Sequence, residues 1–362
     1  ASYQYYVLTS LGLKVTKVSL VHINSNYVRI GDLDLDQLFI KQDITKEIKD
    51  LQENVKNNIK EINEYVEKSE EIKDIDENCF KPYPCPFFKY CTKHLPEKNI
   101  FDIPRMQTRQ KLKLYQKGIY SYEDLLREEI KENYKKTIEY ELYEKEDYID
   151  KKEIKKFMDT LTHPLYFLDF ETYQMPVPLY DNVSPYEQIP FQYSLHYIDK
   201  ELKHKEFLAQ SGIDPRRTLA EQLIKDIPKN VTTLAYNMGF EKSVIKRLAK
   251  LYPDLSEHLM NIHDNIKDLM IPFQKGYYYT KEMHGSYSIK YVLPALFPND
   301  PSLNYKNLDL IHNGSEAMSS FQDLVNKTQE EQNYIRERLL KYCELDTYAM
   351  VKIYEKLKEK IN

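Results

Sequence analysis

The sequence contains no tryptophan and only 8 glycines in 362 residues, whereas it contains 32 tyrosines. We interpret this bias as a sign of an AT-rich coding genome and not as a sign of function. Positive charge is not in excess either, because the formal net charge at pH 7 is −5. This charge excludes a protein that coats DNA by being basic throughout. A nucleic-acid partner would have to meet a local Lys/Arg surface, helped by metal ions that offset acidic ligands.

Long apolar segments are also absent, and no run approaches the ~20 residues that a membrane-spanning helix needs. Residues 1–27 lack the basic start, apolar core and small-residue cleavage site of a signal peptide. We therefore expect no membrane partner and a cytoplasmic location. In that reducing compartment, clustered cysteines usually bind a metal instead of forming disulfides.

Hydrophobic residues make up 41% of the chain and charged residues 30%, which is enough to build real cores. The length indicates more than one domain, and the pattern predicts three parts. Residues 1–95 end in a cysteine cluster, 96–160 are a charged helical connector, and 161–362 alternate strands with helices. Within the connector, residues 128–156 are expected to be a solvated helix or linker. In the last part we expect strands at 165–171, 191–198, 202–209 and 232–236, and helices at 218–227, 240–251, 288–296 and 329–361. In the first part we expect helices at 5–13 and 45–66, and strands at 17–24 and 27–30.

Two acidic residues, Asp169 and Glu171, lie two positions apart in the apolar segment LYFLDFE. In a strand, this spacing places both side chains on the same face. Burying acids in such a segment is costly unless they have ligands, which indicates a functional role. Asp199 and Glu201 have the same spacing but lie in a predicted turn, where acids are solvated.

Other acidic positions fall on different predicted elements. Asp346 and Tyr342 are four residues apart in the last helix and share one helical face. The same spacing recurs at Tyr143 and Asp147 in the connector, so that spacing alone says little. Glu241 follows a further apolar strand, at a strand-to-helix junction.

A few convergent carboxylates suit hard Mg²⁺ or Mn²⁺ ions, which prefer oxygen ligands. Two such ions ~4 Å apart can activate a water and stabilise the leaving oxygen when a phosphodiester is hydrolysed. A nearby tyrosine hydroxyl can orient that water. The pattern alone is therefore compatible with a metal-dependent phosphodiester hydrolase, and solvated surface acids are the alternative.

Three segments, FLDFET, AYNMGFE and YCELDT, resemble in this order the exonuclease motifs of the DnaQ-like (DEDD) superfamily. The resemblance covers residues 161–362 and implies an α/β domain with a ribonuclease H-like mixed sheet flanked by helices. It implies a nuclease that removes nucleotides from the 3′ ends of single-stranded DNA or RNA with two Mg²⁺ or Mn²⁺ ions. The same resemblance assigns metal binding to Asp169, Glu171, Glu241 and Asp346, water orientation to Tyr342, and substrate binding to Asn237 and Phe240. Lys341 stands where a second subtype has its histidine, so the tyrosine subtype is favoured.

Motif two departs from the superfamily, because Glu241 stands where an aspartate is usual. Asp268 is the reserve metal ligand, and its alternative role is that of an acid at a helix end or on the surface. Ser288 is a predicted helix N-cap and forms, with Lys290, a candidate phosphate site. The alternative there is an ordinary capped helix with an exposed lysine. The main rival function is a catalytically weak or inactive ribonuclease H-like domain that binds nucleic acid or a protein partner. A second rival is an endonucleolytic ribonuclease, or a nuclease that acts on small nucleotides, with the same metal site but a different cleft.

Three of the 4 cysteines, Cys79, Cys85 and Cys91, are separated by five residues each. This clustering predicts metal binding, and both Zn²⁺ and a [4Fe–4S] cluster are open, each normally with four protein ligands. His94 is a candidate for the fourth ligand. Cys343 lies far away in the sequence, and we expect it to be a packed thiol.

Residues 4–91 resemble the C-terminal half of iron–sulfur nucleases of the PD-(D/E)XK class, including RecB-like and CRISPR-associated types. Gln4 matches the late Gln of their Gln-x-x-x-Tyr motif, with Leu8 at the Tyr position. In that class one cluster cysteine lies far upstream, as do the catalytic Asp and Glu-x-Lys residues. The resemblance therefore implies a truncated module that is inactive as a nuclease. Its fusion to a DnaQ-like domain resembles a bacterial family catalogued as a domain of unknown function.

Overall fold

A computed structural model describes residues 1–70, 73–143 and 145–361. The chain forms two compact units. The smaller unit comprises Ala1–Ile75, Lys89–Cys91 and Gln174–Glu187, and the larger comprises Asp76–Phe88, Thr92–Tyr173 and Gln188–Asn362. The predicted connector and the predicted C-terminal domain therefore share one unit, apart from the loop 174–187. No helix within the described residues is both long and apolar enough to cross a membrane.

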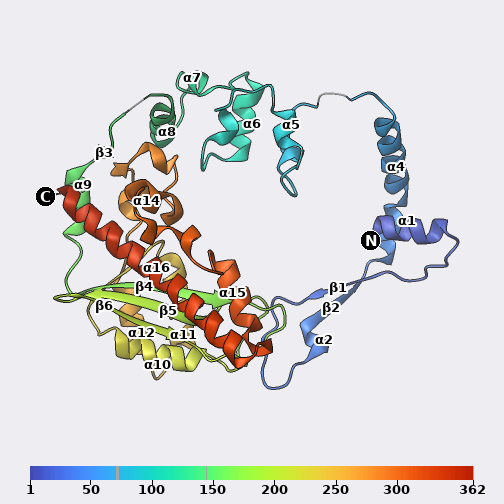
Figure 1. Ribbon diagram of the computed structural model, residues 1–362. Helices are drawn as coiled ribbons and strands as arrows, with labels where there is room; N and C mark the ends of the chain where they lie inside the picture. Colours follow the sequence, from blue (N-terminus) through green and yellow to red (C-terminus); the bar gives the residue numbers. More distant parts are fainter. Residues whose placement is uncertain (71–72, 144, 362) are drawn as a thin grey trace. The chain divides into compact units, whose positions relative to one another are not determined.

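The larger unit is built on a five-stranded mixed sheet, which confirms the predicted α/β class (Figure 1). The strand order is β6 (Leu202–Leu208), β5 (Ile189–Ile198), β4 (Leu165–Tyr173), β7 (Thr232–Ala235) and β8 (Ile266–Asp268). β4 pairs antiparallel with β5 and parallel with β7, so it lies at the centre of the sheet. A central strand is covered on both faces, which explains why LYFLDFE is almost continuously apolar.

Alternate residues of β4 point into two different cores. Leu165 and Phe167 belong to one core, whereas Tyr166, Leu168 and Phe170 belong to the other. The first core is covered by α9 (Lys151–Met158), α14 (Ile289–Leu296) and α16 (Gln329–Ile361), and the second by α10 (Arg216–Asp226), α11 (Gly239–Leu251) and α12 (Ser256–Asp264). The period of two therefore places Asp169 and Glu171 on the side of the sheet that α16 covers.

Shorter elements close the larger unit. α15 (Gly314–Asp323) packs at the end of β4 and β5, where Phe321 stacks on Phe191 with ring centroids 4.1 Å apart. The remaining short helices of this unit are η1 (Glu77–Cys79), η2 (Ile100–Asp102), α6 (Thr108–Gln116), α7 (Tyr122–Leu125), α13 (Ile271–Gln274), η3 (Lys281–Met283), η4 (Pro301–Leu303), η5 (Tyr305–Asn307) and η6 (Leu324–Asn326). The helix α5 (Phe88–Cys91) has all but its first residue in the smaller unit.

The connector is helical as predicted, but the expectation that it is a solvated linker is wrong. Its helix α8 (Glu132–Leu142) buries Tyr134, Ile138 and Tyr140. The following strand β3 (Tyr148–Ile149) pairs with β9 (Tyr278–Tyr279). The high content of Lys and Glu suggested a solvated segment, but an amphipathic helix needs only one apolar stripe to pack against a core.

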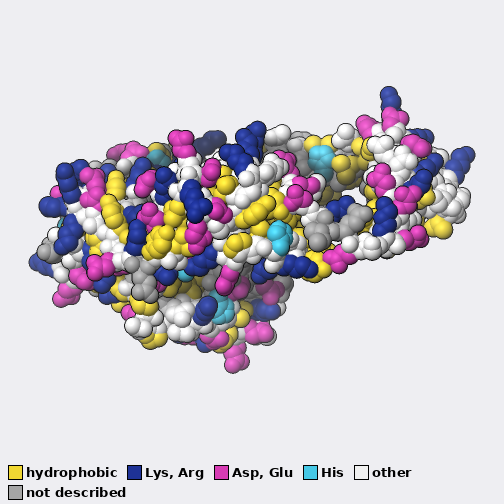
Figure 2. Space-filling model, turned by 90° about the horizontal axis from the view of Figure 1, so that it is seen from above, with side chains coloured by type: hydrophobic (Ala, Val, Ile, Leu, Met, Phe, Trp, Pro, Cys, Tyr) yellow, Lys and Arg dark blue, Asp and Glu magenta, His cyan; other side chains and the backbone are white. Residues whose placement is uncertain are grey.

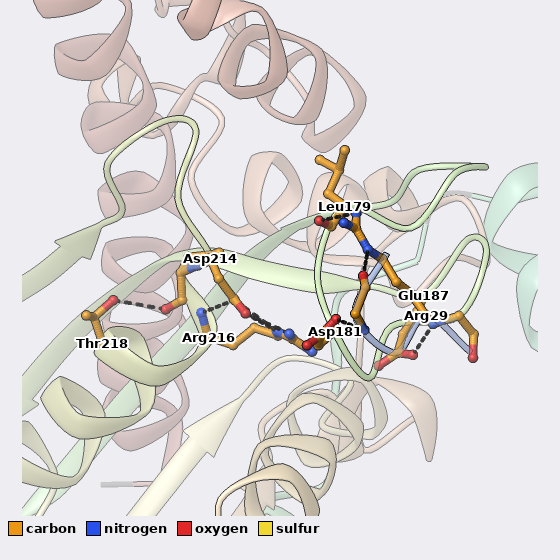
Figure 3. Close-up of polar contacts among 10 residues, drawn as sticks. Arg29, Leu179, Asp181, Glu187, Asp214, Arg216 and Thr218 are labelled. Carbon is orange, nitrogen blue, oxygen red and sulfur yellow. Dashed lines mark hydrogen bonds and ion pairs between the residues drawn. The ribbon is translucent and has the colours of Figure 1, made fainter. Parts of the chain in front are cut away.

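The smaller unit contains α1 (Ser2–Ser10), α2 (Leu35–Leu38), α3 (Thr45–Asp50) and α4 (Gln52–Val66), and the hairpin of β1 (Ser19–Ile23) and β2 (Phe39–Asp43). The predicted strand 27–30 is wrong, since β1 pairs with β2 instead. Arg29 is held by the loop 174–187: its backbone exchanges hydrogen bonds with Asn182 and Val183, and its side chain donates to the carbonyl of Leu179 at 2.8 Å (Figure 3).

Candidate metal centre

The structure brings Asp169, Glu171 and Asp346 together. One carboxylate oxygen of each lies within 4.8 Å of the others. The first two project from β4, and the third projects from α16, which packs over the same face of the sheet. Residues that are 175 positions apart in the chain are thereby joined, as the convergence of a strand and a late helix predicted.

The pKa values of all three acids are raised. Burial raises the pKa of Asp169, and the negative charges of Asp346 and Glu171 raise it further. Burial, followed by the charge of Asp346, raises the pKa of Glu171 to about 8. Burial raises the pKa of Asp346 to about 6. A buried glutamate and two half-buried aspartates of like charge suit a site for divalent cations, because the ions would offset both the burial and the repulsion.

Two tyrosines contact Asp346. The hydroxyl of Tyr305 donates to its Oδ1 at 2.6 Å. Tyr342 lies one turn earlier on α16 and is 6% exposed. Burial has the largest effect on the pKa of Asp346 and raises it, whereas Tyr305, Lys290 and a hydrogen bond from Tyr342 lower it, in that order of size. Burial and then the charge of Asp346 raise the pKa of the Tyr342 hydroxyl, which therefore stays protonated. Tyr305 was missed from the sequence, because it lies in a short turn and is one of 32 tyrosines.

Glu241 lies in the first turn of α11 and is 3% exposed. Its Oε2 is buried and has no hydrogen-bond partner. The pKa of Asp169 is raised by burial, by the charges of Asp346 and Glu171, and to a smaller extent by the charge of Glu241. Glu241 therefore lies close enough to interact electrostatically with the acidic group. It is nevertheless outside the group whose oxygens lie within 4.8 Å. Burial raises the pKa of Glu241 itself to about 8.

Asp268, the reserve ligand, is occupied by the backbone. Its carboxylate accepts hydrogen bonds from the N–H groups of Asn237 at 2.9 Å, Met238 at 3.3 Å and Met270 at 3.0 Å. These bonds hold the turn between β7 and α11, in which Asn237 has a left-handed φ of 70°. Asp268 therefore has a local structural role, which favours Glu241 as the motif-two acid.

The other predicted substrate residues lie at this turn and at the start of α14. Asn237 is exposed and Phe240 is 37% exposed, beside the buried Glu241. Lys290 is exposed. Burial and the charge of Asp346 raise the pKa of Glu171, and the positive charge of Lys290 lowers it by a smaller amount, so Lys290 lies near the acidic group. Ser288 occupies the N-cap position of α14, but its side chain makes no capping hydrogen bond. The predicted N-cap position is therefore confirmed, but the hydroxyl makes no hydrogen bond to the first-turn N–H groups.

The four cysteines are all free. Cys343 is fully buried, with its Sγ 3.9 Å from Oδ2 of Asp169, so it is the packed thiol that we expected. In the larger unit, the N–H of Cys85 donates to the carbonyl of Cys79 at 2.9 Å. The groups of three potential metal ligands found among the described residues do not include Cys79, Cys85 or Cys91. Metal binding by these cysteines stays a prediction.

Comparison with known proteins gives similarity without an assigned activity. A family model described as "Domain of unknown function (DUF2779)" matches residues 166–288. The chain is 28% identical over 208 residues to the uncharacterized protein MG366 of Mycoplasma genitalium, which covers 52% of this chain and 31% of that protein. It is 26% identical over 219 residues to the uncharacterized protein UU173 of Ureaplasma parvum, covering 54% and 31%. The matched stretch is about a third of the length of these curated relatives.

No solved structure matches the chain at a significant level. The stretch matched by the family model contains Asp169, Glu171 and Glu241, but it ends before α16, which carries Asp346. The match to the family model therefore includes the acids on β4 and α11 but not the one on α16.

Proposed function

We propose that this protein is a metal-dependent 3′→5′ exonuclease with a ribonuclease H-like domain, which hydrolyses single-stranded DNA or RNA. The observation that carries the proposal is the approach of the Asp169, Glu171 and Asp346 oxygens to within 4.8 Å of one another. The order of the three motifs supports the nuclease class, and the 3′ direction rests on the resemblance alone.

The residues present fit two Mg²⁺ or Mn²⁺ ions. The ligand set is made of carboxylate oxygens, the donors that these hard cations prefer. The partnerless Oε2 of Glu241 is a buried acceptor in need of a positive charge. When bound, the two ions would activate the attacking water and stabilise the leaving oxygen.

The side chains around the acids have separate roles in this proposal. Tyr342 holds the attacking water through its protonated hydroxyl, and Tyr305 fixes the carboxylate of Asp346 by its hydrogen bond. Lys290 binds a substrate phosphate, and the exposed ring of Phe240 packs against the terminal base, with Asn237 beside it. Base stacking on an aromatic ring is independent of sequence, which suits an exonuclease.

A nucleic-acid partner has to be bound by local basic groups, since the net charge is −5. Figure 2 shows Lys and Arg side chains intermingled with Asp and Glu over the face that it presents. We propose a cytoplasmic setting, in which Cys79, Cys85 and Cys91 stay reduced and take part in binding Zn²⁺ or a [4Fe–4S] cluster. A visible absorption band after anaerobic purification distinguishes the cluster from zinc.

The position of Glu241 outside the tight acidic group favours one alternative, a catalytically weak or inactive domain that binds nucleic acid. The deciding experiment uses DNA and RNA oligonucleotides labelled at the 3′ or the 5′ end, with Mn²⁺ or EDTA. Stepwise shortening from the 3′ end that is lost with EDTA and in Asp169→Asn supports the exonuclease. Retarded migration of an intact oligonucleotide, with no cleavage in Mn²⁺, supports the binding domain.

A further inference from the structure

A second group of potential metal ligands lies on the same face of the sheet and shares no residue with the acidic group. It consists of His196 on β5, His204 on β6 and Glu344 on α16, with one ligand atom of each within 4.8 Å of the others. His196 and His204 are direct cross-strand partners, and their ring centroids are 4.5 Å apart. None of the three takes part in the proposed nuclease chemistry.

Each imidazole uses one nitrogen in a chain of hydroxyl groups. His196 Nδ1 is 2.8 Å from the hydroxyl of Thr347, and His204 Nε2 is 2.9 Å from that of Ser194. The two hydroxyl oxygens are 2.6 Å apart, and Thr347 also donates to the carbonyl of Glu344 at 3.1 Å.

One assignment of protons satisfies all of these contacts. Thr347 donates to the carbonyl, and its oxygen then accepts from His196 Nδ1–H and from the Ser194 hydroxyl. The Ser194 oxygen in turn accepts from His204 Nε2–H. This arrangement leaves lone pairs on His196 Nε2 and His204 Nδ1. Metal-binding histidines are usually held in this way, with the second ring nitrogen donating to a polar group.

The third ligand completes the geometry. His204 Nδ1 is 3.9 Å from Glu344 Oε1, which is too long for a hydrogen bond. Bonds of ~2.0–2.2 Å from both atoms to one ion can span this gap. The side chains of His204 and Glu344 are 24% and 49% exposed, so an ion can enter from solvent.

His196 is also in the state that binds metals. Burial, followed by the charge of His204, lowers the pKa of His196 to about 4, so this ring is neutral at neutral pH. Two imidazole nitrogens and one carboxylate oxygen make up the proposed donor set. This donor set differs from the all-oxygen set of Asp169, Glu171 and Asp346, because imidazole favours Zn²⁺ and its neighbours over Mg²⁺.

We propose that His196, His204 and Glu344 form a binding site for a transition-metal dication of the Zn²⁺ type. The ion joins the β5–β6 hairpin to α16. Since Glu344 is two residues before Asp346, the ion also fixes the helical turn that carries the acidic centre. Its role is therefore structural support of that turn, and the site does not depend on the proposed nuclease activity.

The test uses the full chain, stripped with a chelator and returned to excess Mg²⁺ before titration with Zn²⁺. Bound zinc is counted by elemental analysis after gel filtration, and circular dichroism verifies folding. Glu344→Gln preserves the shape of an exposed side chain, and His204→Ala removes a second ligand. Asp169→Asn controls for zinc at the acidic centre. His312→Ala is the matched control, because His312 is an exposed histidine 3.1 Å from Glu316 that belongs to no group of three potential ligands among the described residues.

We expect Glu344→Gln and His204→Ala to bind one equivalent of zinc less than the wild type, and Asp169→Asn and His312→Ala to match it. A difference count is unaffected by any zinc on the cysteines. Zinc should also raise the melting temperature of the wild type by more than that of the two ligand variants. Equal zinc content in Glu344→Gln, His204→Ala and wild type would overturn the proposal and leave the group as a hydrogen-bonded structural network.

Discussion

The hydroxyl of Tyr305 donates a 2.6 Å hydrogen bond to Oδ1 of Asp346, 41 residues further along the chain. This bond ties a short turn after α14 to the helix that completes the acidic centre. It holds the Asp346 carboxylate in one orientation, which a ligand of a metal pair needs.

Tyr305→Phe should therefore weaken metal binding and catalysis without unfolding the protein. A hydrogen bond to a charged group contributes ~1.5–3 kcal/mol, so we expect a loss of about tenfold or more in kcat and a higher Mn²⁺ requirement. Rates measured across Mn²⁺ concentrations give both quantities. Tyr291→Phe, at an exposed position on α14, is the control. A wild-type Mn²⁺ dependence in Tyr305→Phe would show that the bond is incidental.

Tyr342→Phe tests the water-orienting role. We expect kcat to fall by ~10²–10³-fold, in the range for loss of a group that positions a reacting proton, while KM changes little. Single-turnover cleavage of a 3′-labelled oligonucleotide measures the chemical step. Tyr143→Phe is a matched control, because Tyr143 and Asp147 have the same sequence spacing but Tyr143 is exposed. A parallel rise in KM with unchanged kcat would instead assign Tyr342 to binding.

The buried acids predict a stability that depends on pH in EDTA. In the folded state the pKa of Glu171 is raised from 4.5 to about 8 and that of Asp346 from 3.8 to about 6. Above the ordinary carboxyl pKa values and up to about pH 8, the folded state therefore binds more protons than the unfolded state. Stability should therefore fall as the pH rises from about 4.5 to about 8. Urea unfolding at pH 5.5 and pH 8 measures the difference, and Mn²⁺ should remove it.

Glu171→Gln should reduce this pH dependence and stabilise the metal-free protein at pH 8. One unit of pKa shift corresponds to ~1.4 kcal/mol, so we expect a gain of at least ~1 kcal/mol. Glu330→Gln, at an exposed position in the first turn of α16, should leave the pH dependence unchanged. If Glu171→Gln destabilises the protein in EDTA at pH 8, the carboxylate has a cationic or hydrogen-bonding partner without any metal.

Asp268 and Glu241 should respond in opposite ways to neutralisation. Asp268→Asn replaces an acceptor of three backbone N–H groups, and we expect a loss of ~1–3 kcal/mol in the free energy of unfolding. Glu241→Gln replaces a carboxyl group whose Oε2 has no hydrogen-bond partner, so stability should hold while the rate in Mn²⁺ falls. Urea unfolding and cleavage assays on both variants provide the test. Full stability with lost activity in Asp268→Asn would make Asp268 the metal ligand.

Lys290→Ala should weaken substrate binding through the loss of a phosphate contact. We expect KM to rise by up to about tenfold at low salt, with the difference shrinking as salt increases, since each phosphate contact releases counterions. Lys246→Ala, at an exposed position on α11, is the control. A KM that is unchanged at every salt concentration would return Lys290 to the role of an ordinary exposed helix residue.

Local patterns were sufficient for the main elements of the larger unit. The apolar run LYFLDFE indicated β4, and its period of two placed Asp169 and Glu171 on one face. A spacing of four likewise put Tyr342 and Asp346 on one side of α16. These relations follow from backbone geometry over a few residues, so the sequence by itself determined them.

Contacts between distant segments had no such local signal. The bond from Tyr305 to Asp346 and the pairing of His196 with His204 depend on a loop path and on hairpin register. The role of Asp268 depends on where the N–H groups of the turn at Asn237 point. Only the tertiary structure decided these features, because side chains far apart in the chain become neighbours through packing, which short-range periodicity does not encode.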